Sequence, residues 1–375
     1  PRAGSDQTVA EGEKFGIECV RSKTGEASRI TVTNYESLHK FRDQDFVAAV
    51  CDESSILKSF IGARRQEITA FMRKMPYRLL CTATAAPNDY FELGTSSEAL
   101  GQLSHTDMLA RFFKDQQNVI VKRWATTGIF SGRWRFKKHA ELPFWRWLCS
   151  WARACRRPSD LQFEDGPFIL PQMNERQVVV KARKPRPDLL FELPAIGLRE
   201  QRDELRRTIE ERSETVASLV AQHPGPAVVW CHLNAEGDTL EQLIPDARQV
   251  KGGQEDDEKE EIFRDFTSGR LRVIITKPKI GAWGLNWQHC AFVTMFPSHS
   301  FEQYYQAVRR CWRFGQTRPV EVSLIVTEGQ RDVLSNLIRK AGLADRMFTA
   351  LVANMNQATS IARNNGKPQT VEVPE

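Results

Sequence analysis

Two acidic residues directly follow a short apolar run in the first part of the chain. The run Phe46 to Cys51 has the composition of a buried strand, and Asp52 and Glu53 come next. In open α/β sheets ligands bind at the carboxyl ends of strands, so this pair would face a ligand crevice. An aspartate there can hold Mg²⁺ through water, and the next glutamate can orient an attacking water. Taken alone, such a pair is more often part of a solvated loop.

Two threonines end the next apolar run. The run Tyr77 to Cys81 is typical of a strand, and Thr82 and Thr84 follow it at the same kind of position. Small hydroxyl side chains at a strand end can couple the acidic pair to a second lobe that moves. Threonines after a strand are also common in ordinary loops, so this pattern is weak by itself.

Two arginines near the end of a predicted helix form the most specific pattern. The helix is expected over Phe301–Trp312, and Arg310 and Arg313 are three residues apart, so they share one helical face. Two guanidinium groups on one face suit the charge that develops on a transferred γ-phosphoryl group. The alternative is a basic surface helix, which the following Gly315 and Gln316 make less favoured.

A glycine-bearing loop follows another predicted strand, Leu271–Ile275. It runs from Gly281 through Gly284 to Asn286. Glycines at a strand end let the backbone approach a phosphate closely. We therefore expect Gly284 and Asn286 to lie beside a bound nucleotide.

These residues need a scaffold in which strands alternate with helices, the pattern of an α/β parallel sheet. The expected strands are Ile30–Thr33, Phe46–Cys51, Tyr77–Cys81, Ala227–Cys231, Leu271–Ile275, Phe292–Phe296 and Val320–Val326. The expected helices are Leu57–Met75, Phe144–Cys155, Arg199–Ala221, Gly237–Leu243, Glu255–Phe266 and Phe301–Trp312.

Residues 111–157 interrupt this alternation with a basic, tryptophan-rich segment. It holds twelve lysines and arginines against two acids, and five of the nine tryptophans. Cations neutralise phosphates and release counterions, so the segment predicts contact with a nucleic-acid backbone. The expected phosphate contacts are Arg133, Arg135, Lys137 and Lys138. The alternatives are a solvated basic face and tryptophans that only pack a core, a role we assign to Trp145, Trp147 and Trp151.

Composition sets the outer bounds of the prediction. A chain of 375 residues with 41% hydrophobic content can form two domains. It has no apolar run long enough to span a membrane, and residues 1–10 lack the apolar stretch of a signal peptide. None of the eight cysteines forms a C-x-x-C pair, so we expect reduced, buried thiols rather than a zinc site.

In order and spacing these motifs resemble those of superfamily 2 helicases, in particular the Swi/Snf-related branch. The resemblance covers roughly residues 30–345. In detail the sequence is most similar to helicases of phages and prophages, which share the Glu-Ser-Ser box and the Trp-rich insertion. The segments that carry it are Asp52 to Ser55 (motif II), Leu79 to Leu93 (III), Val228 to Leu240 (IV), Thr276 to Asn286 (V) and Gln306 to Gln316 (VI).

The resemblance implies a role for each matching position. Asp52 would bind Mg²⁺ and Glu53 would be the catalytic base. Arg310 and Arg313 would be arginine fingers, with Gln306 near the nucleotide. Thr82 and Thr84 would link the ATP state to lobe motion. Contacts to the DNA backbone would come from Thr33, Asn34, Tyr35 and Thr276.

The sequence departs from the family in two places. A motor of this type needs a phosphate-binding loop, G-x-x-x-x-G-K-S/T, and residues 1–375 do not contain one. We therefore expect a preceding segment, or another polypeptide, to carry it. Ser54 and Ser55 also replace the usual third and fourth residues of motif II, which puts its contact with the second lobe in doubt.

The favoured prediction is an ATP- and Mg²⁺-dependent translocase on duplex DNA, intracellular in a prokaryote or a phage-infected cell. Its fold class would be α/β, with two RecA-like parallel-sheet lobes, the first incomplete, and a basic helical insertion between them. We expect lobe one over residues 1–104, the insertion and linker over 105–190, lobe two over 191–353 and a flexible tail over 354–375. The rivals are the motor subunit of a restriction system and a non-catalytic DNA-binding module.

Overall fold

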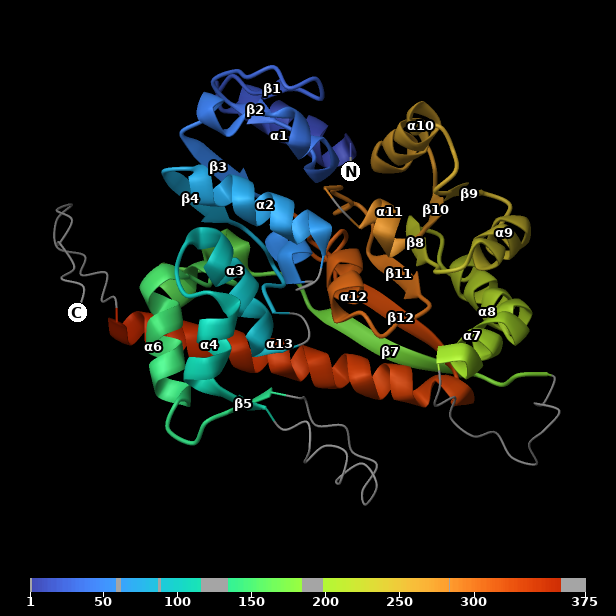
Figure 1. Cartoon of the computed structure of the whole chain (residues 1–375). Coiled ribbons are helices and arrows are strands. Elements are labelled where there is room, and N and C mark those ends of the chain that lie inside the picture. The colour runs from blue at the N-terminus through green and yellow to red at the C-terminus, as the bar shows by residue number, and fades with distance from the viewer. Residues whose placement is uncertain are drawn as a thin grey trace.

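The computed structural model describes residues 2–58, 62–86, 89–115, 134–183, 198–282 and 284–358. The chain is an α/β protein, and its larger part is built on one parallel sheet (Figure 1). None of the helices in these ranges combines the length and apolar character needed to cross a membrane.

Lobe two is built on a six-stranded, fully parallel sheet with the order β7-β12-β11-β8-β10-β9. Three of its inner strands, β8, β10 and β11, are fully buried, which explains their continuous apolar sequences. The strands are β7 (Met173–Val180), β8 (Ala227–Trp230), β9 (Ala247–Val250), β10 (Val273–Thr276), β11 (Phe292–Met295) and β12 (Val320–Thr327).

Helices cover both faces of this sheet. One face packs against α10, α12 and α13 through a cluster that contains Trp230, Ile274 and Leu324. The opposite face packs against α8 and α9, around Val229 and Ile275. The helices of lobe two are α7 (Leu198–Arg207), α8 (Ile209–Ala221), α9 (Asn234–Leu243), α10 (Asp256–Thr267), α11 (Pro278–Gly281) and α12 (Phe301–Val308).

Lobe one is smaller, and its strands form two separate two-stranded parallel sheets, β1-β2 and β3-β4. Helix α2 packs on β3-β4 through a cluster of Cys51, Leu57, Ile68 and Met72. The elements are α1 (Arg2–Lys14), β1 (Val20–Arg21), β2 (Thr31–Val32), β3 (Ala48–Cys51), α2 (Ala63–Lys74), β4 (Tyr77–Leu80) and α3 (Leu93–Leu100).

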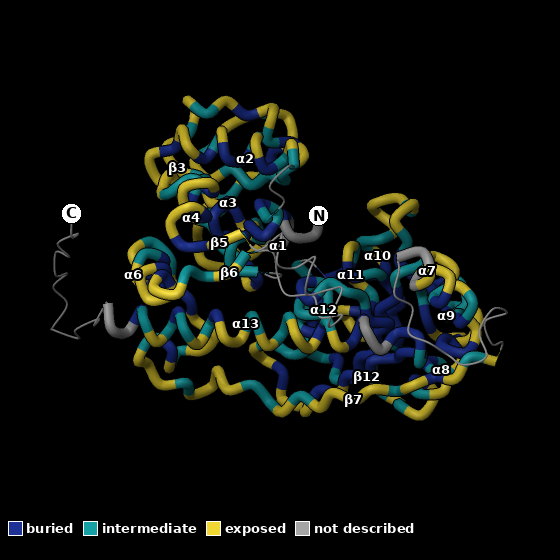
Figure 2. The backbone as a smooth tube through the Cα atoms, turned by 60° about the horizontal axis from the view of Figure 1, so that its bottom comes forward, coloured by how far each residue is buried: buried dark blue, intermediate teal, exposed yellow. Residues whose placement is uncertain are grey.

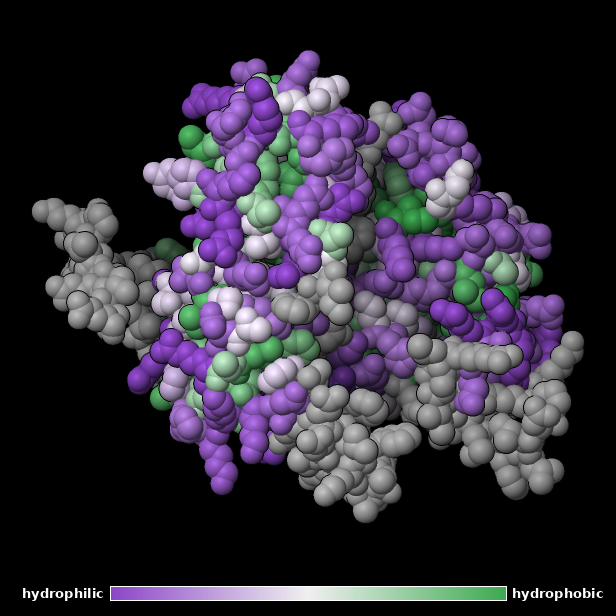
Figure 3. Space-filling view, in the orientation of Figure 1, coloured by the Kyte–Doolittle hydropathy of each residue, from purple (hydrophilic) through white to green (hydrophobic). Residues whose placement is uncertain are grey.

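One face of β3-β4 remains open. Val47, Val50, Tyr77 and Leu79 are all more than half exposed, which is unusual for a parallel sheet. In the space-filling view, apolar green patches lie among the hydrophilic purple of this end of the molecule (Figure 3).

The insertion contains an aromatic core rather than a purely helical one. It consists of α4 (His105–Phe112), the antiparallel pair β5 (Phe113–Asp115) and β6 (Trp134–Phe136), and α6 (Glu141–Trp151). Phe144, in α6, packs edge-on against Phe112 and Phe113 at 5.4 and 5.5 Å between ring centroids. Trp145 is buried, and the Trp147 and Trp151 rings lie 5.4 Å apart, so these tryptophans contribute to packing.

A single long helix, α13 (Arg331–Ala358), joins the two halves of the molecule (Figure 1). Near its start, Leu334 and Leu337 belong to the core of lobe two. Further along, Met347 and Leu351 belong to the aromatic cluster of the insertion, where α13 lies against α6. The tail expected from residue 354 therefore begins later, since the helix continues to Ala358, and residues 359–375 lie outside the described part.

Two sequence-based boundaries and one expectation about the cysteines need correction. Strand β7 pairs with β12 over its whole length, so the expected insertion and linker of 105–190 includes a strand of lobe two. The expected helix Arg199–Ala221 breaks at Thr208, whose hydroxyl donates to the Glu204 carbonyl. The expectation of buried thiols fails for Cys155, which is exposed, and holds only in part for Cys19 and Cys81, which are half-buried; all eight cysteines are free.

Candidate active site

The acidic pair lies where strand β3 ends and the chain turns into a short 3-10 helix, η3 (Ser54–Lys58). The Ser54 amide donates to the Cys81 carbonyl at 2.9 Å, which ties the ends of β3 and β4 together. Glu53 has a φ of +51°, a left-handed conformation that non-glycine residues rarely adopt. Such strain is concentrated at functional sites, where the surrounding structure holds it in place.

Glu53 reaches across to lobe two. Its two carboxylate oxygens accept from the Gln306 side-chain amide at 3.0 and 3.2 Å. Burial, followed by the nearby Asp52 carboxylate, raises the pKa of Glu53 to about 7, against a smaller opposing effect of Arg310. A carboxylate with this pKa can take up or release a proton near neutral pH.

Arg310 continues the same chain of contacts. Its guanidinium donates to the Gln306 side-chain oxygen at 3.0 Å, to the Gln306 carbonyl at 3.1 Å and to the Leu285 carbonyl at 3.0 Å. Burial, followed by Arg313, lowers the pKa of Arg310 to about 10, so it stays charged at neutral pH. The Gln306 amide thus lies between the carboxylate of one lobe and a buried cation of the other.

Arg313 lies next to Arg310 but is less enclosed. It donates to the same Leu285 carbonyl at 3.3 Å, and burial lowers its pKa. Its Nε is buried and has no partner among the described residues. This atom is therefore available to an acceptor from outside the described residues.

The expected shared helical face of the two arginines is wrong. Helix α12 ends at Val308, and both arginines lie in the turns that follow. The helix ends early because the backbone around Arg310 turns to the motif V loop, where the Trp287 amide donates to the Arg310 carbonyl at 2.9 Å. The two side chains still converge, through the Leu285 carbonyl rather than through helical spacing.

The loop from Gly281 to Asn286 presents a backbone carbonyl to the arginines, whereas Gly284 and Asn286 were expected to lie beside a nucleotide. Gly284 has a φ of +71°, which requires glycine, and the following Leu285 presents its carbonyl to both arginines. The side-chain oxygen of Asn286 is buried without a partner in the described part of the chain. The loop thus positions the arginines, and Asn286 is left available for a further contact.

The two threonines lie beside this site without joining its hydrogen bonds. Thr82 accepts from the Thr84 amide at 3.1 Å, which shapes the turn after β4. The Thr84 hydroxyl is buried and unpartnered within the described residues. It lines a cavity of about 200 Å³ whose other walls include Phe301 and Tyr305 of α12. Thr84 therefore lies between lobe one and the helix that carries Gln306, and Thr82 shapes the turn that holds it.

Three residues expected at the DNA backbone have internal partners instead. Thr276 is fully buried at the end of β10 and donates to the Val250 carbonyl, so the predicted surface contact is wrong for this residue. Asn34 caps a 3-10 helix, η1 (Tyr35–Lys40), by accepting from the Ser37 amide. The Tyr35 hydroxyl donates to the Asp52 carbonyl and so supports the acidic pair.

Thr33 differs from its neighbours, because its hydroxyl is buried with no partner among the described residues. The burial of Thr33 and Thr276 was not visible in the sequence, since hydroxyl residues at strand ends are as often internal as exposed.

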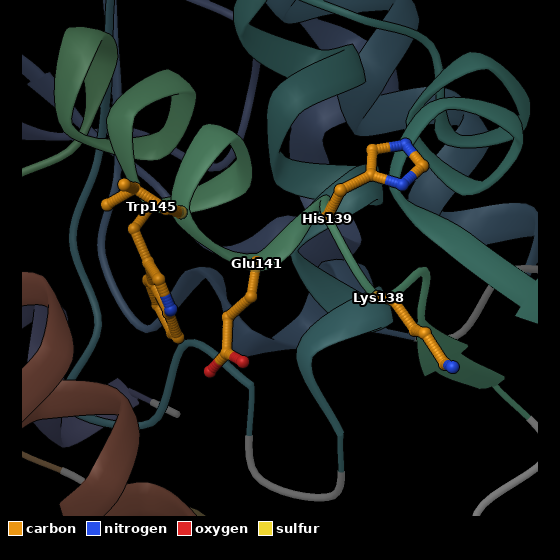
Figure 4. A pocket seen from close by; sticks show the side chains of 5 residues that line it. Lys138, His139, Glu141 and Trp145 are labelled. Atoms are coloured by element: carbon orange, nitrogen blue, oxygen red, sulfur yellow. The ribbon is translucent and has the colours of Figure 1, made fainter.

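The basic segment is only partly placed. Arg133 lies outside the described residues. Arg135 and Lys138 are exposed, whereas Lys137 is half-buried and donates to the Ala110 carbonyl. Next to α6 is an open hollow of about 470 Å³ lined by Lys138, Glu141 and Trp145, among others. Figure 4 shows the Glu141 and Trp145 side chains close together on α6, with Lys138 on the segment before it. An acid and an aromatic ring therefore share the lining with Lys138, so this hollow is not a uniformly basic groove.

Asp52 is the residue that fits a hydrated metal ion. It is exposed, and one of its oxygens accepts from the Glu53 amide at 2.9 Å. Within the described ranges, no group of three or more His, Cys, Asp or Glu side chains could hold a metal by itself. Mg²⁺ commonly binds through one or two carboxylates together with substrate phosphates and water, so a single carboxylate is compatible with it.

One contact of the site was missed from the sequence. Lys58, at the end of η3, forms an ion pair with Glu302 of α12, across the lobes. The available signal was helical spacing, since Glu302 precedes Gln306 by four residues on one face.

Comparison with known protein families finds a match in lobe two. Residues 211–315 match the family model of the helicase conserved C-terminal domain, which includes Gln306, Arg310 and Arg313. This segment is therefore similar to a helicase C-terminal domain, and the match covers less than half of the chain. The match begins inside α8 and ends at Gly315, so strands β7 and β12 of the same sheet lie outside it. No curated protein matches the sequence.

Solved structures extend the likeness to the whole fold. The structure of S. cerevisiae Dbp5 bound to RNA and ADP BeF3 aligns with 94% of this chain and 79% of that one, at 13% identity and a TM-score of 0.53. The C-terminal part of the Fun30 ATPase domain aligns with 39% of this chain at 13% identity and a TM-score of 0.31, and the chain covers 54% of that structure. At 13% identity the likeness to the Dbp5 structure establishes the two-lobed fold alone.

Proposed function

We propose that this chain is the motor part of an ATP-dependent translocase of superfamily 2 that moves on duplex DNA. The observation that carries the proposal is the chain of contacts from Glu53 through Gln306 to Arg310, which joins an acid of one lobe to a cation of the other. Hydrolysis of a phosphoanhydride needs both a base for water and cations for the transferred phosphoryl group.

In this proposal ATP binds between the lobes. Glu53 accepts the proton of the attacking water, which its raised pKa permits near neutral pH. Arg310 and Arg313 neutralise charge on the phosphoryl oxygens, and they are held next to each other for this by the Leu285 carbonyl. Mg²⁺, bound through Asp52, would add neutralisation of the phosphates.

The groups must exchange partners before they can act. In the structure Gln306 occupies both oxygens of Glu53, and all three donor nitrogens of Arg310 have protein acceptors. A nucleotide between the lobes would take over some of these contacts. Exchange of this kind couples hydrolysis to lobe movement, with Thr82 and Thr84 at the junction.

Duplex DNA is proposed as the track because the insertion carries a local net charge of +10 in a chain whose total is +6. Exposed Arg135 and Lys138 belong to this segment. Phosphate contacts of this kind do not read the base sequence, which suits a motor that moves along any duplex.

A second candidate is a nucleic-acid-binding module without catalysis. The observation in its favour is that residues 1–375 contain no G-x-x-x-x-G-K-S/T sequence. Hydrolysis of ATP by the purified product of the complete gene, measured with duplex DNA, single-stranded DNA and RNA, separates the candidates. Stimulation by duplex DNA supports the translocase. Absence of hydrolysis with all three supports the module, and stimulation by RNA alone contradicts the DNA assignment.

A further inference from the structure

The two lobes touch at a second point, one helical turn from the Glu53–Gln306 contact. Lys58 pairs with Glu302, and Glu302 and Gln306 are four residues apart on α12. On the other side, Glu53 directly precedes η3 and Lys58 is its last residue. Helix α12 therefore contacts lobe one just before η3 through an amide and at the end of η3 through an ion pair.

Burial makes this ion pair different from a surface pair. The Glu302 side chain is 9% exposed and the Lys58 side chain 33% exposed. Exposed pairs are screened by water and salt and constrain little. When one charge of a buried pair loses its partner, its burial is left uncompensated. The lobes therefore strongly prefer the register of α12 on η3 that keeps the two charges together.

The pair also fixes the position of Gln306. Because Glu302 is held on lobe one, the next turn of the helix places the Gln306 amide at the Glu53 carboxylate, at 3.0 Å. The same amide accepts from Arg310. A shift of α12 along η3 would therefore separate the proposed base from the proposed arginine finger.

We propose that Lys58 and Glu302 are positioning residues, whose ion pair sets the register of α12 on η3 and so brings Gln306 to Glu53. The effect on turnover rests on the proposed function, but the effect on register does not. Neither residue contributes a side chain to the apolar clusters of the two lobes, so the pair acts between the lobes rather than within one.

The first test measures register without any hydrolysis. A Glu53→Cys, Gln306→Cys variant of the chain is treated with a short bis-maleimide, and the cross-linked peptide is quantified by mass spectrometry. Adding Lys58→Met or Glu302→Gln, which remove one charge at similar size, should lower the yield about tenfold, the scale of coupling between contacting residues. The matched control is Lys251→Met, which breaks the exposed pair with Asp238 inside lobe two and should leave the yield unchanged.

The second test asks whether register matters for turnover in the complete gene product. Lys58→Glu and Glu302→Lys should each lower kcat about tenfold with little change in the KM for ATP, and the double charge swap should restore most of it. Circular dichroism and thermal unfolding show whether a reversal variant still folds. Where one does not, Lys58→Met and Glu302→Gln replace it in the same assay.

The outcomes separate the two proposals. Cross-linking that depends on Lys58 in a protein that never hydrolyses ATP supports the positioning role and removes the translocase. Cross-linking that is indifferent to both neutral substitutions overturns the positioning role, whatever the rate of hydrolysis. Hydrolysis that falls in both single reversals and stays low in the swap also overturns it, because the residues then act separately.

Discussion

Glu53 concentrates more unusual properties than any other residue of the site. It combines a left-handed backbone, a contact across the lobes and a pKa raised to about 7. In the complete gene product, Glu53→Gln should lower turnover by about 10²- to 10⁴-fold, since the amide keeps the shape and cannot accept the proton. Binding of a fluorescent ATP analogue should persist. Turnover near the normal rate would exclude Glu53 as the base.

The pKa of Glu53 gives a separate prediction on pH. A base acts when it is unprotonated, so the rate should rise as pH increases through about 7 and level off above it. The direction of this pH dependence follows from burial, which disfavours the charged carboxylate and so keeps Glu53 protonated below about pH 7. A pH profile of kcat/KM between pH 5 and 9, where denaturation is checked by fluorescence, tests this expectation. A rate that is flat from pH 5 upward would contradict it.

The two arginines should respond differently to substitution. Arg313→Ala should lower turnover by about 10³- to 10⁵-fold, the range for arginine fingers, with little loss of stability. Arg310 is 8% exposed and each of its three guanidinium nitrogens donates one hydrogen bond, so Arg310→Ala should also destabilise the fold by about 1–3 kcal/mol. Turnover and urea unfolding, measured on both variants, separate the effects. Equal stability of the two would show that Arg310 is not structural.

At the scale of elements, the sequence predicts the interior well and the edges poorly. The apolar runs at Ala227 and Phe292 indicate buried strands, and both form the centre of the sheet. Strands β7 and β9 were missed for different reasons. Figure 2 shows β7 exposed over most of its length, and periodicity cannot identify a strand whose side chains mostly face water. Strand β9 is largely buried, but it has only four residues and carries Arg248 and Gln249 in its middle, so it lacks an apolar run.

The site shows the same limit. The acidic pair and the arginines are conspicuous by residue type, but the Leu285 carbonyl that gathers the arginines is a backbone group and leaves no signal in composition. The early end of α12 at Val308 depends on a tertiary hydrogen bond to Trp287, which local propensity does not contain.

The insertion gives a prediction on salt dependence. Replacing Arg133, Arg135, Lys137 and Lys138 with alanine should flatten the slope of log affinity against log salt by up to about three or four, at about 0.9 for each phosphate. Lys137 already has a partner in the Ala110 carbonyl, which favours the lower figure. Fluorescence anisotropy on two unrelated duplexes should show an equal loss on both. An unchanged slope would place this segment away from the DNA.

Helix α13 gives a prediction on stability. Leu351 is 7% exposed in the aromatic cluster of the insertion, so Leu351→Ala should lower the free energy of unfolding by about 2–5 kcal/mol. Ile338 lies on the same helix and is 56% exposed, so Ile338→Ala serves as the matched control and should have little effect. Equal losses in the two variants would indicate that α13 does not pack as the structure has it.

At the scale of the whole molecule, the fold brings the site residues together, but the sequence lacks the phosphate-binding loop that the resemblance calls for. No G-x-x-x-x-G-K-S/T occurs in residues 1–375. We expect this chain alone to bind ATP weakly and to turn it over far below about 1 s⁻¹, the lower end of ordinary enzyme rates. A DNA-stimulated rate at or above that value, measured on the purified 375-residue chain, would contradict the expectation.

The long helix at the end of the described chain is long enough to work as a lever. Its 28 residues correspond to a rod of about 42 Å at 1.5 Å per residue. If lobe two turned by about 10°, the far end of such a rod would sweep about 7 Å. That end packs against α6 in the cluster of the insertion, which also includes Ala86 and Leu93 of lobe one, so a rotation of lobe two would load the contacts that the insertion makes with both lobes. Any stroke between the lobes would then be delivered to the insertion, at the place where the exposed cations Arg135 and Lys138 lie.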